Sequence, residues 1–257
     1  MTAIPQGRIR RRVGLAGAVC ALAVTGLGLT GCSEEDPDAG TNGVGKLPPA
    51  KIQAETRTAA GAADAVHLSG TVVAGGSTYE LDMRLKDDGG SGSLTAQGAT
   101  FELLRIDDEL YLKADAAFWD HEDGKDGTDG SDEDDSAAAA DKLGGKYVKV
   151  PQGDPAYKRF SGFTDMDVLL DGLLTLHGAL ATDGHHEQAG VRTIRITGDK
   201  GSGGTLDVSL QGKPYPLRLI RAGDAGTLRF SDWGEDFALK QPPKDETVDY
   251  GRQLPTS

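Results

Sequence analysis

The feature that most constrains the fold is a repeated alternation of apolar and polar residues. In segment 78–85 the apolar side chains occupy every second position, and the turn sequence Asp87-Asp88-Gly89-Gly90 follows. Comparable strands are predicted at 66–74, 91–97, 99–106, 109–113 and 146–150, and a second set at 191–197, 205–210, 216–221, 227–231 and 235–240. The short spacings leave room only for hairpins, which predicts an antiparallel sheet with one dry and one wet face.

Two segments predict helices that pack on this sheet. Residues 50–65 are good helix formers, but their inner face, Ile52 followed by alanines and threonines, is slim. Such a face fits either close packing or a space beside the helix. In 164–177 an apolar stripe recurs at helical spacing, with Thr164 and Asp167 as an approximate capping box and His177 at its end as a dipole-favoured cap. The pattern predicts an α+β fold with one domain over 50–244 and a surface tail at 245–257.

The first 32 residues have the order of a secretory signal. Arginines 8 and 10–12 precede a weakly apolar run, 13–29, and the sequence Leu29-Thr30-Gly31-Cys32 follows. This ending resembles the bacterial lipobox, which implies a signal peptide at 1–31, cleavage, and acylation of Cys32. Two or more acyl chains hold a protein on a bilayer, so we expect a lipid anchor at the extracytoplasmic face of the cell membrane. The alternative is an uncleaved anchor with an incidental cysteine.

Composition restricts the partners and the covalent chemistry. The net charge is −13, and it falls to −17 without residues 1–31, which contain four arginines and no acid. Such a charge disfavours nucleic-acid binding. The other cysteine, Cys20, lies in the predicted signal peptide, so no disulfide is expected in the mature chain.

Two acidic segments are expected outside the packed core. The segment 32–49 is acidic and rich in glycine, which predicts a flexible tether. The eight acids of 121–135 indicate a solvated insertion over 120–135, with weak cation binding as the alternative.

No metal, cofactor or catalytic site is expected. His185 and His186, beside Asp183 and Glu187, point to opposite sides of an extended segment and are more typical of a polar turn than of a metal site. The chain lacks a Gly-x-Ser-x-Gly frame, a His-Glu-x-x-His motif and a phosphate-binding glycine loop. The sequence therefore disfavours an enzyme, although a hydrolase with a triad assembled in space stays open.

Several segments together resemble one protein family. They are the lipobox, the helix before the first strand, Val66-His-Leu-Ser-Gly-Thr-Val, the segment Ile106-Asp-Asp-Glu-Leu-Tyr-Leu-Lys113, and Phe230-Ser-Asp-Trp-Gly-Glu-Asp-Phe237 leading to Pro242-Pro243. With them the chain resembles the LppX/LprG family of actinobacterial lipoproteins, related in fold to the LolA-type carriers. The resemblance implies a strongly curved antiparallel half-barrel with helices on its concave face. It also implies an apolar cavity for the acyl chains of lipids or lipoglycans, carried or presented at the cell envelope.

The cavity implied by this resemblance would be lined by apolar side chains of the strands and of the second helix. The candidates are Tyr79, Leu81, Met83, Leu103, Tyr111, Leu169, Leu173, Ile194, Leu206, Val208, Leu219 and Phe230. Because burial of an acyl chain needs only apolar surface, no specific motif is required. Two alternatives remain: a filled core, and an envelope scaffold that binds no ligand and engages a protein partner through its acidic surface.

Overall fold

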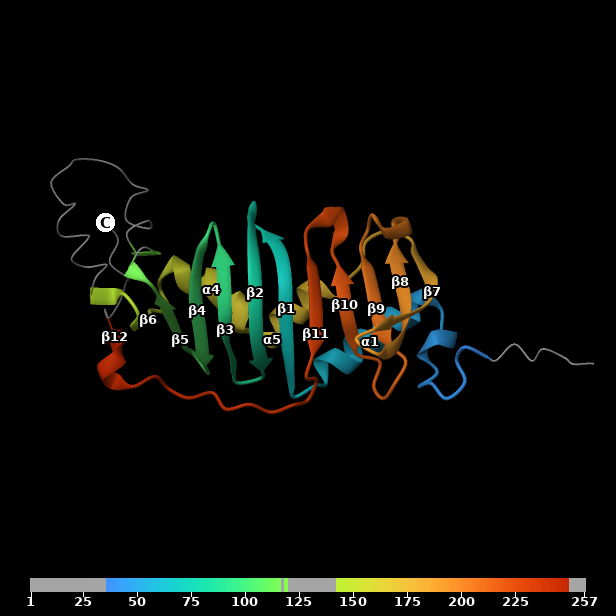
Figure 1. The fold of residues 1–257 in the computed structure, drawn as a ribbon, viewed down its shortest axis with the longest axis horizontal. Coiled ribbons are helices and arrows are strands. Elements are labelled where there is room, and N and C mark those ends of the chain that lie inside the picture. Colours follow the sequence, from blue (N-terminus) through green and yellow to red (C-terminus); the bar gives the residue numbers. More distant parts are fainter. Residues whose placement is uncertain (1–35, 117, 120–141, 250–257) are drawn as a thin grey trace, which may run out of the picture. The chain divides into compact units, whose positions relative to one another are not determined.

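The computed structural model of the protein describes residues 36–116, 118–119 and 142–249. The predicted signal peptide, Cys32 and the acidic insertion at 120–135 lie outside these residues. The described strands form one curved, open sheet of twelve strands in the order β12-β6-β5-β4-β3-β2-β1-β11-β10-β9-β8-β7, and three helices cover one of its faces (Figure 1). This confirms the predicted α+β fold class.

Ten of the twelve strands match the predicted segments closely; β7 and β12 do not. Their bounds are β1 (Ala65–Ala74), β2 (Ser77–Lys86), β3 (Gly89–Ala96), β4 (Ala99–Ile106), β5 (Glu109–Ala114), β6 (Tyr147–Val150), β7 (Leu180–Gln188), β8 (Val191–Gly198), β9 (Thr205–Ser209), β10 (Pro216–Ile220), β11 (Thr227–Ser231) and β12 (Thr247–Asp249). In β2 the side chains of Leu81, Met83 and Leu85 are buried, whereas those between them are exposed. One face of the sheet is therefore dry, as its sequence predicts.

The helices lie on the dry side of the sheet, here named the helix face. Helix α1 (Pro49–Gly61) packs over β7 and β8, α4 (Pro155–Thr164) packs over β2 to β4, and α5 (Met166–Leu173) contacts both helices. The single helix predicted at 164–177 is wrong: Asp165 has an extended conformation and caps α5 by accepting the N–H of Val168 at 3.0 Å. Since α5 ends at Leu173, His177 does not cap it.

Three predictions about the sheet differ from the structure. Segment 235–240 forms no strand, and the Lys86 ammonium approaches Asp236 there at 3.3 Å. The predicted polar turn at 183–187 is part of β7, which pairs with β8 and has mostly exposed side chains, so it lacks an apolar alternation. The sheet is also not wholly antiparallel, because β12 pairs with β6 in parallel.

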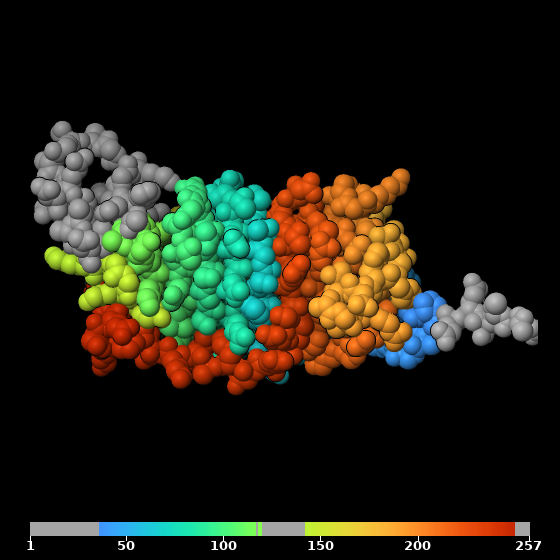
Figure 2. Space-filling view, viewed as in Figure 1, coloured from blue at the N-terminus to red at the C-terminus, as the bar shows by residue number. Residues whose placement is uncertain are grey.

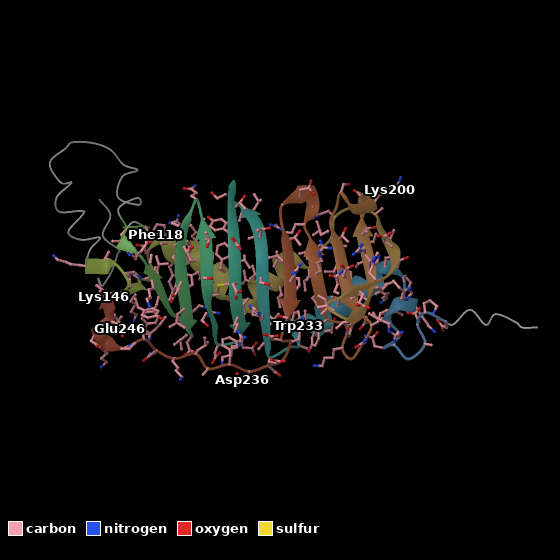
Figure 3. All side chains as sticks on the ribbon, in the orientation of Figure 1. Phe118, Lys146, Lys200, Trp233, Asp236 and Glu246 are labelled. Atoms are coloured by element: carbon pink, nitrogen blue, oxygen red, sulfur yellow. The ribbon has the colours of Figure 1, made fainter. Side chains whose placement is uncertain are left out.

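Both ends of the described chain are attached to the sheet. Residues 36–47 belong to the predicted tether, but Asn42 donates to the carbonyl oxygens of Ser209 and Gly212 at 3.0 and 3.1 Å, and Val44 is buried. In the predicted C-terminal tail, residues 247–249 form β12. The segment before β12 follows one margin of the sheet (Figure 2), where Figure 3 places Trp233, Asp236 and Glu246.

A continuous apolar core fills the space between the helices and the sheet over the described residues. It joins side chains of all three helices to those of both strand sets; the largest fully buried ones include Ile52, Leu68, Met83, Leu110, Met166 and Leu206. Glycine is required where strands β2 and β3 meet, because a Cβ at Gly92 would lie 2.1 Å from the carbonyl oxygen of Asp82.

Among the described residues, no helix has the length and apolar character needed to cross a membrane.

Candidate functional site

A groove of about 510 Å³ runs between α1 and α5 on the helix side of the molecule. Exposed residues of α1 line one wall, and Leu170 and Leu174, which are 4% and 1% exposed, form its apolar floor. Its volume falls within the roughly 300–1,000 Å³ that is usual for small-molecule sites. An apolar floor below a polar rim suits an amphipathic ligand.

Helix α1 has small residues both toward the sheet and toward the groove. Ile52, Thr56 and Ala60 are the buried residues of α1, as the sequence predicts, so the helix lies close to the sheet. Its outward positions next to α5 are also small: Ala54, Thr58 and Gly61 line the groove. The Arg57 guanidinium and the Asp171 carboxylate form an ion pair that joins α1 to α5 beside it.

Most of the predicted lining residues lie on the helix face. Nine are buried in the apolar core: Leu81, Met83, Leu103, Leu173, Ile194, Leu206, Val208, Leu219 and Phe230. Tyr79 and Leu169 are half-buried against the same core. The fold therefore brings these side chains together, but they contact other apolar side chains of one cluster, and none of them lines the groove between α1 and α5.

Tyr111 lies on the opposite face of the sheet, here named the outer face. Leu110 and Leu112 point into the core, so the residue between them points away from it. Its hydroxyl donates to Glu109 at 2.8 Å, and Lys149 donates to the same carboxylate at 2.6 Å. The hydrogen bond from Lys149 holds the pKa of Glu109 below its usual value, and burial raises the pKa of Tyr111 to about 12.

The raised pKa of Tyr111 predicts a loss of stability in alkali. Tyrosine in an unfolded chain ionises near pH ~10. The folded state favours the neutral phenol, so this stabilisation is complete below pH ~10 and is lost as the pH rises from about 10 to about 12. We expect Tyr111→Phe to flatten the fall of the unfolding free energy across this interval, measured by urea denaturation. Tyr147→Phe is the control and should show the same decrease in unfolding free energy as the natural protein, because Tyr111 remains. The prediction would be contradicted if the unfolding free energy of Tyr111→Phe fell with pH as steeply as that of the natural protein.

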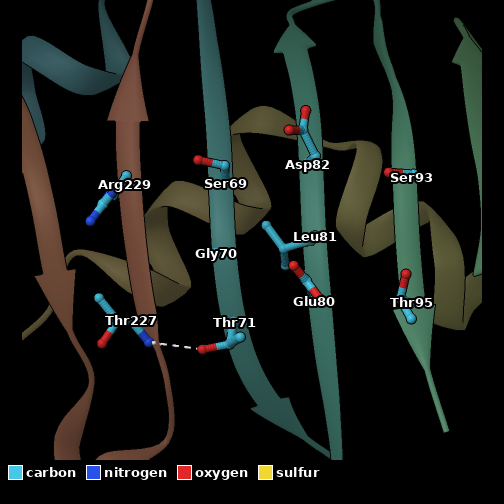
Figure 4. A pocket seen from close by; sticks show the side chains of 10 residues that line it. All are labelled: Ser69, Gly70, Thr71, Glu80, Leu81, Asp82, Ser93, Thr95, Thr227 and Arg229. Carbon is cyan, nitrogen blue, oxygen red and sulfur yellow. Dashed lines mark hydrogen bonds between the residues drawn. The ribbon is translucent and has the colours of Figure 1, made fainter. Parts of the chain in front are cut away.

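The outer face has two polar grooves. The first, of about 530 Å³, is lined mainly by hydroxyl and charged side chains of β1, β2, β3 and β11 (Figure 4): Ser69, Thr71, Glu80, Asp82, Ser93, Thr95, Thr227 and Arg229. The second, of about 630 Å³, shares Asp82 and Ser93 with it and extends to Tyr147 and to Lys240 of the C-terminal segment. Neither groove has the apolar floor of the groove between the helices, so neither suits an acyl chain.

A serine, a histidine and an aspartate lie within hydrogen-bond reach on the outer face. His67 Nε2 is 2.8 Å from Asp82 Oδ1, and its Nδ1 is 3.3 Å from Ser231 Oγ. Asp232 Oδ2, 3.5 Å from the same Nδ1, competes with Ser231 for it. Acyl transfer also needs N–H donors aimed at the developing oxyanion, and His67 lies in an interior strand paired on both sides. We therefore interpret the cluster as a hydrogen-bonded polar network on the outer face.

The adjacent histidines have separate partners. His185 Nε2 lies 3.0 Å from Asp38, and His186 Nε2 lies 2.8 Å from the carbonyl oxygen of Asp183. In the described part of the chain, no group of three or more histidine, cysteine, aspartate or glutamate residues could hold a metal ion.

Comparison with solved structures identifies the fold. The crystal structure of LprF from Mycobacterium bovis superimposes with a TM-score of 0.52 at 15% sequence identity, over 75% of this chain and 95% of LprF. The chain has the LprF fold. The Mycobacterium tuberculosis lipoprotein LppX is also similar, with a TM-score of 0.42 and 17% identity over 75% of this chain and all of LppX. No protein-family model matches the chain, and no curated protein matches its sequence. The predicted resemblance is thus confirmed at the level of the fold.

Proposed function

We propose that the protein is a membrane-anchored, extracytoplasmic lipoprotein that binds the acyl chains of lipids or lipoglycans and carries or presents them at the cell envelope. The observation that supports this most directly is the groove between α1 and α5, with Leu170 and Leu174 on its floor. The chain shares its fold with LprF, and its helices pack on the dry face of an open sheet, so the groove between α1 and α5 opens beside the apolar core, to which Leu170 and Leu174 belong.

The chemistry of the groove suits a lipid with a polar head. Each CH₂ group that leaves water is stabilised by about 0.8 kcal/mol, so an acyl chain needs only the apolar floor. Arg57 at the rim can move from Asp171 to an anionic or polar head, since both side chains of this ion pair are exposed and such pairs contribute only about 0–1 kcal/mol.

Native mass spectrometry of the protein, purified from a lipid-containing host, tests this function. We expect added masses that correspond to lipids and that disappear after delipidation. A fluorescent fatty acid should then bind to the delipidated protein with a saturable signal. A protein that is repeatedly empty and takes up no fatty acid would contradict the proposal.

Attachment to the membrane is proposed through Cys32, which lies outside the described residues. We expect Cys32→Ala either to leave the precursor uncleaved or to release the protein from the membrane fraction, because the thioether cannot form. Gel mobility and membrane fractionation measure both outcomes. Cys20→Ala is the matched control and should behave as the natural protein; unchanged size and membrane retention of Cys32→Ala would show that the anchor lies elsewhere.

A second candidate function is an envelope scaffold that binds a protein partner and no lipid. It is favoured by the continuous apolar core, in which nine of the candidate residues already contact other side chains. The mass spectrum separates the two functions, because a scaffold would show neither co-purified lipid nor fatty-acid uptake.

A further inference from the structure

Two arginines stand side by side on the outer face without a partner. Arg218 of β10 and Arg229 of β11 are directly opposite each other in the antiparallel register, which places their Cβ atoms roughly 5 Å apart. Leu219 and Leu228 of the same strands point into the core, so both guanidinium groups are on the outer face. Like charges in this position destabilise a strand pair.

The lack of partners sets this pair apart from the other arginines of the described chain. Arg159 lies over the ring of Phe160. Six others form ion pairs or donate hydrogen bonds to carbonyl oxygens: Arg57, Arg84, Arg105, Arg192, Arg195 and Arg221. Within the described residues, Arg218 and Arg229 alone among the arginines have no such contact. This is unexpected in a chain with a net charge of −13, where carboxylates are abundant.

The carboxylate opposite Arg218 already has other partners. Asp207 of β9 lies opposite Arg218 in the register, but both of its oxygens accept hydrogen bonds from Arg195, at 2.6 and 3.1 Å, and Gln188 donates a further one at 2.9 Å. On the other side, Arg229 is opposite Ser69, and Asp82 follows one strand further, so the backbones of Arg229 and Asp82 are about 10 Å apart. The Asp82 carboxylate already has a partner, His67.

The groove that Arg229 lines has hydroxyl groups on β1 and β11, whereas its two carboxylates, Glu80 and Asp82, belong to β2, two strands away from Arg229. Ser69, Thr71 and Thr227 line the first outer groove with it, and Figure 4 shows the Ser69 hydroxyl directed toward β11. Ser69 and Thr227 use their hydroxyls in no hydrogen bond to another described residue, so both can donate to a ligand. Arg229 and the free hydroxyl donors thus line a groove of about 530 Å³, and Arg218 lies on the neighbouring strand, outside that lining but directly opposite Arg229.

We propose that Arg218 and Arg229 form a binding site for a phosphate group. A phosphate has enough oxygen atoms to accept from two guanidinium forks at once and also from a hydroxyl, whereas a carboxylate has only two oxygens and is satisfied by one fork. The bound group would neutralise the like-charge pair. The phosphate belongs either to a soluble phosphate or to a lipid headgroup. This site is on the face opposite the groove between the helices, so it does not depend on acyl-chain binding.

Isothermal titration calorimetry of the purified full chain with inorganic phosphate, and separately with acetate, tests the site. We expect phosphate to bind more tightly than acetate. The double variant Arg218→Gln/Arg229→Gln should weaken phosphate binding roughly tenfold or more, which corresponds to the loss of a charge-assisted hydrogen bond. The control Lys158→Gln/Arg159→Gln removes the same charge from exposed positions of α4 and should bind as the natural protein does.

A vesicle arm distinguishes the two sources of the phosphate. If the source is a headgroup, the natural protein binds vesicles of phosphatidylcholine with phosphatidylglycerol better than phosphatidylcholine alone, and the double variant loses this difference. If the source is soluble, inorganic phosphate binds and the two vesicle compositions give equal binding. Both results support the site. The site is overturned if inorganic phosphate does not bind and the two vesicle compositions bind equally. It is also overturned if the double variant keeps whichever of these responses the natural protein shows, whatever the result for Cys32 or for fatty acids.

Discussion

Ala54→Trp is expected to abolish fatty-acid uptake by filling the groove between α1 and α5. Ala54 is exposed on α1 and lines the groove opposite Leu170, so an indole at this position occupies the space that the proposed acyl chain needs. Loss of the contacts of only two CH₂ groups already weakens binding roughly tenfold. Titration of a fluorescent fatty acid measures the effect.

The matched control is Ala62→Trp. Ala62 is also exposed and follows α1 as its C-cap residue, but it does not line the groove. This variant should bind fatty acid as the natural protein does, and both variants should keep the natural far-ultraviolet circular dichroism spectrum. Natural affinity in Ala54→Trp would place the acyl chain elsewhere and remove the groove from the proposed function.

Asp207→Ala should give the largest loss of stability among single changes on the outer face. The Asp207 side chain is 1% exposed and that of Arg195 is 19% exposed, and the two form a bidentate ion pair. Removal of one partner of a buried pair costs about 3–5 kcal/mol, because the other charge stays buried without compensation. Since Arg195 keeps some contact with water, we expect a loss of about 3 kcal/mol in urea denaturation, the lower end of that range.

Glu102→Ala is the control for this prediction. Glu102 is a carboxylate on the same face of the sheet, in β4, but it is exposed. Its removal should change the unfolding free energy by no more than about 0.5 kcal/mol. If Asp207→Ala were equally mild, the ion pair between Arg195 and Asp207 would contribute little to the stability of the protein.

Local patterns predicted the strands that are buried on one face only. In β2 the positions of Leu81, Met83 and Leu85 determine which face is dry, because successive side chains of a strand point in opposite directions. The same rule failed for β7, where an edge strand with exposed side chains on both faces leaves no alternation to read. It also failed for β12, whose three residues become a strand only by pairing with β6.

The candidate site was predictable only in part. The slim inner face of α1 follows from Ile52, Thr56 and Ala60, which share one side of a helix. The groove beside it does not follow, because it requires the break at Asp165 that separates α4 from α5 and sets the position of α5 against α1. The prediction that Tyr111 lines the cavity is wrong, because its place in the alternation of β5 puts it on the outer face.

The sequence by itself determined the fold class, the two faces of the main strands and the helix next to them, because these depend on periodicity within one segment. Only the tertiary structure decided which side chains of distant segments meet: the groove between α1 and α5, the Arg195–Asp207 pair, and the two facing arginines of β10 and β11. The physical reason is that the pattern within one segment indicates which of its side chains are buried. The partner of each side chain depends on strand register and helix placement, and these depend on the whole chain.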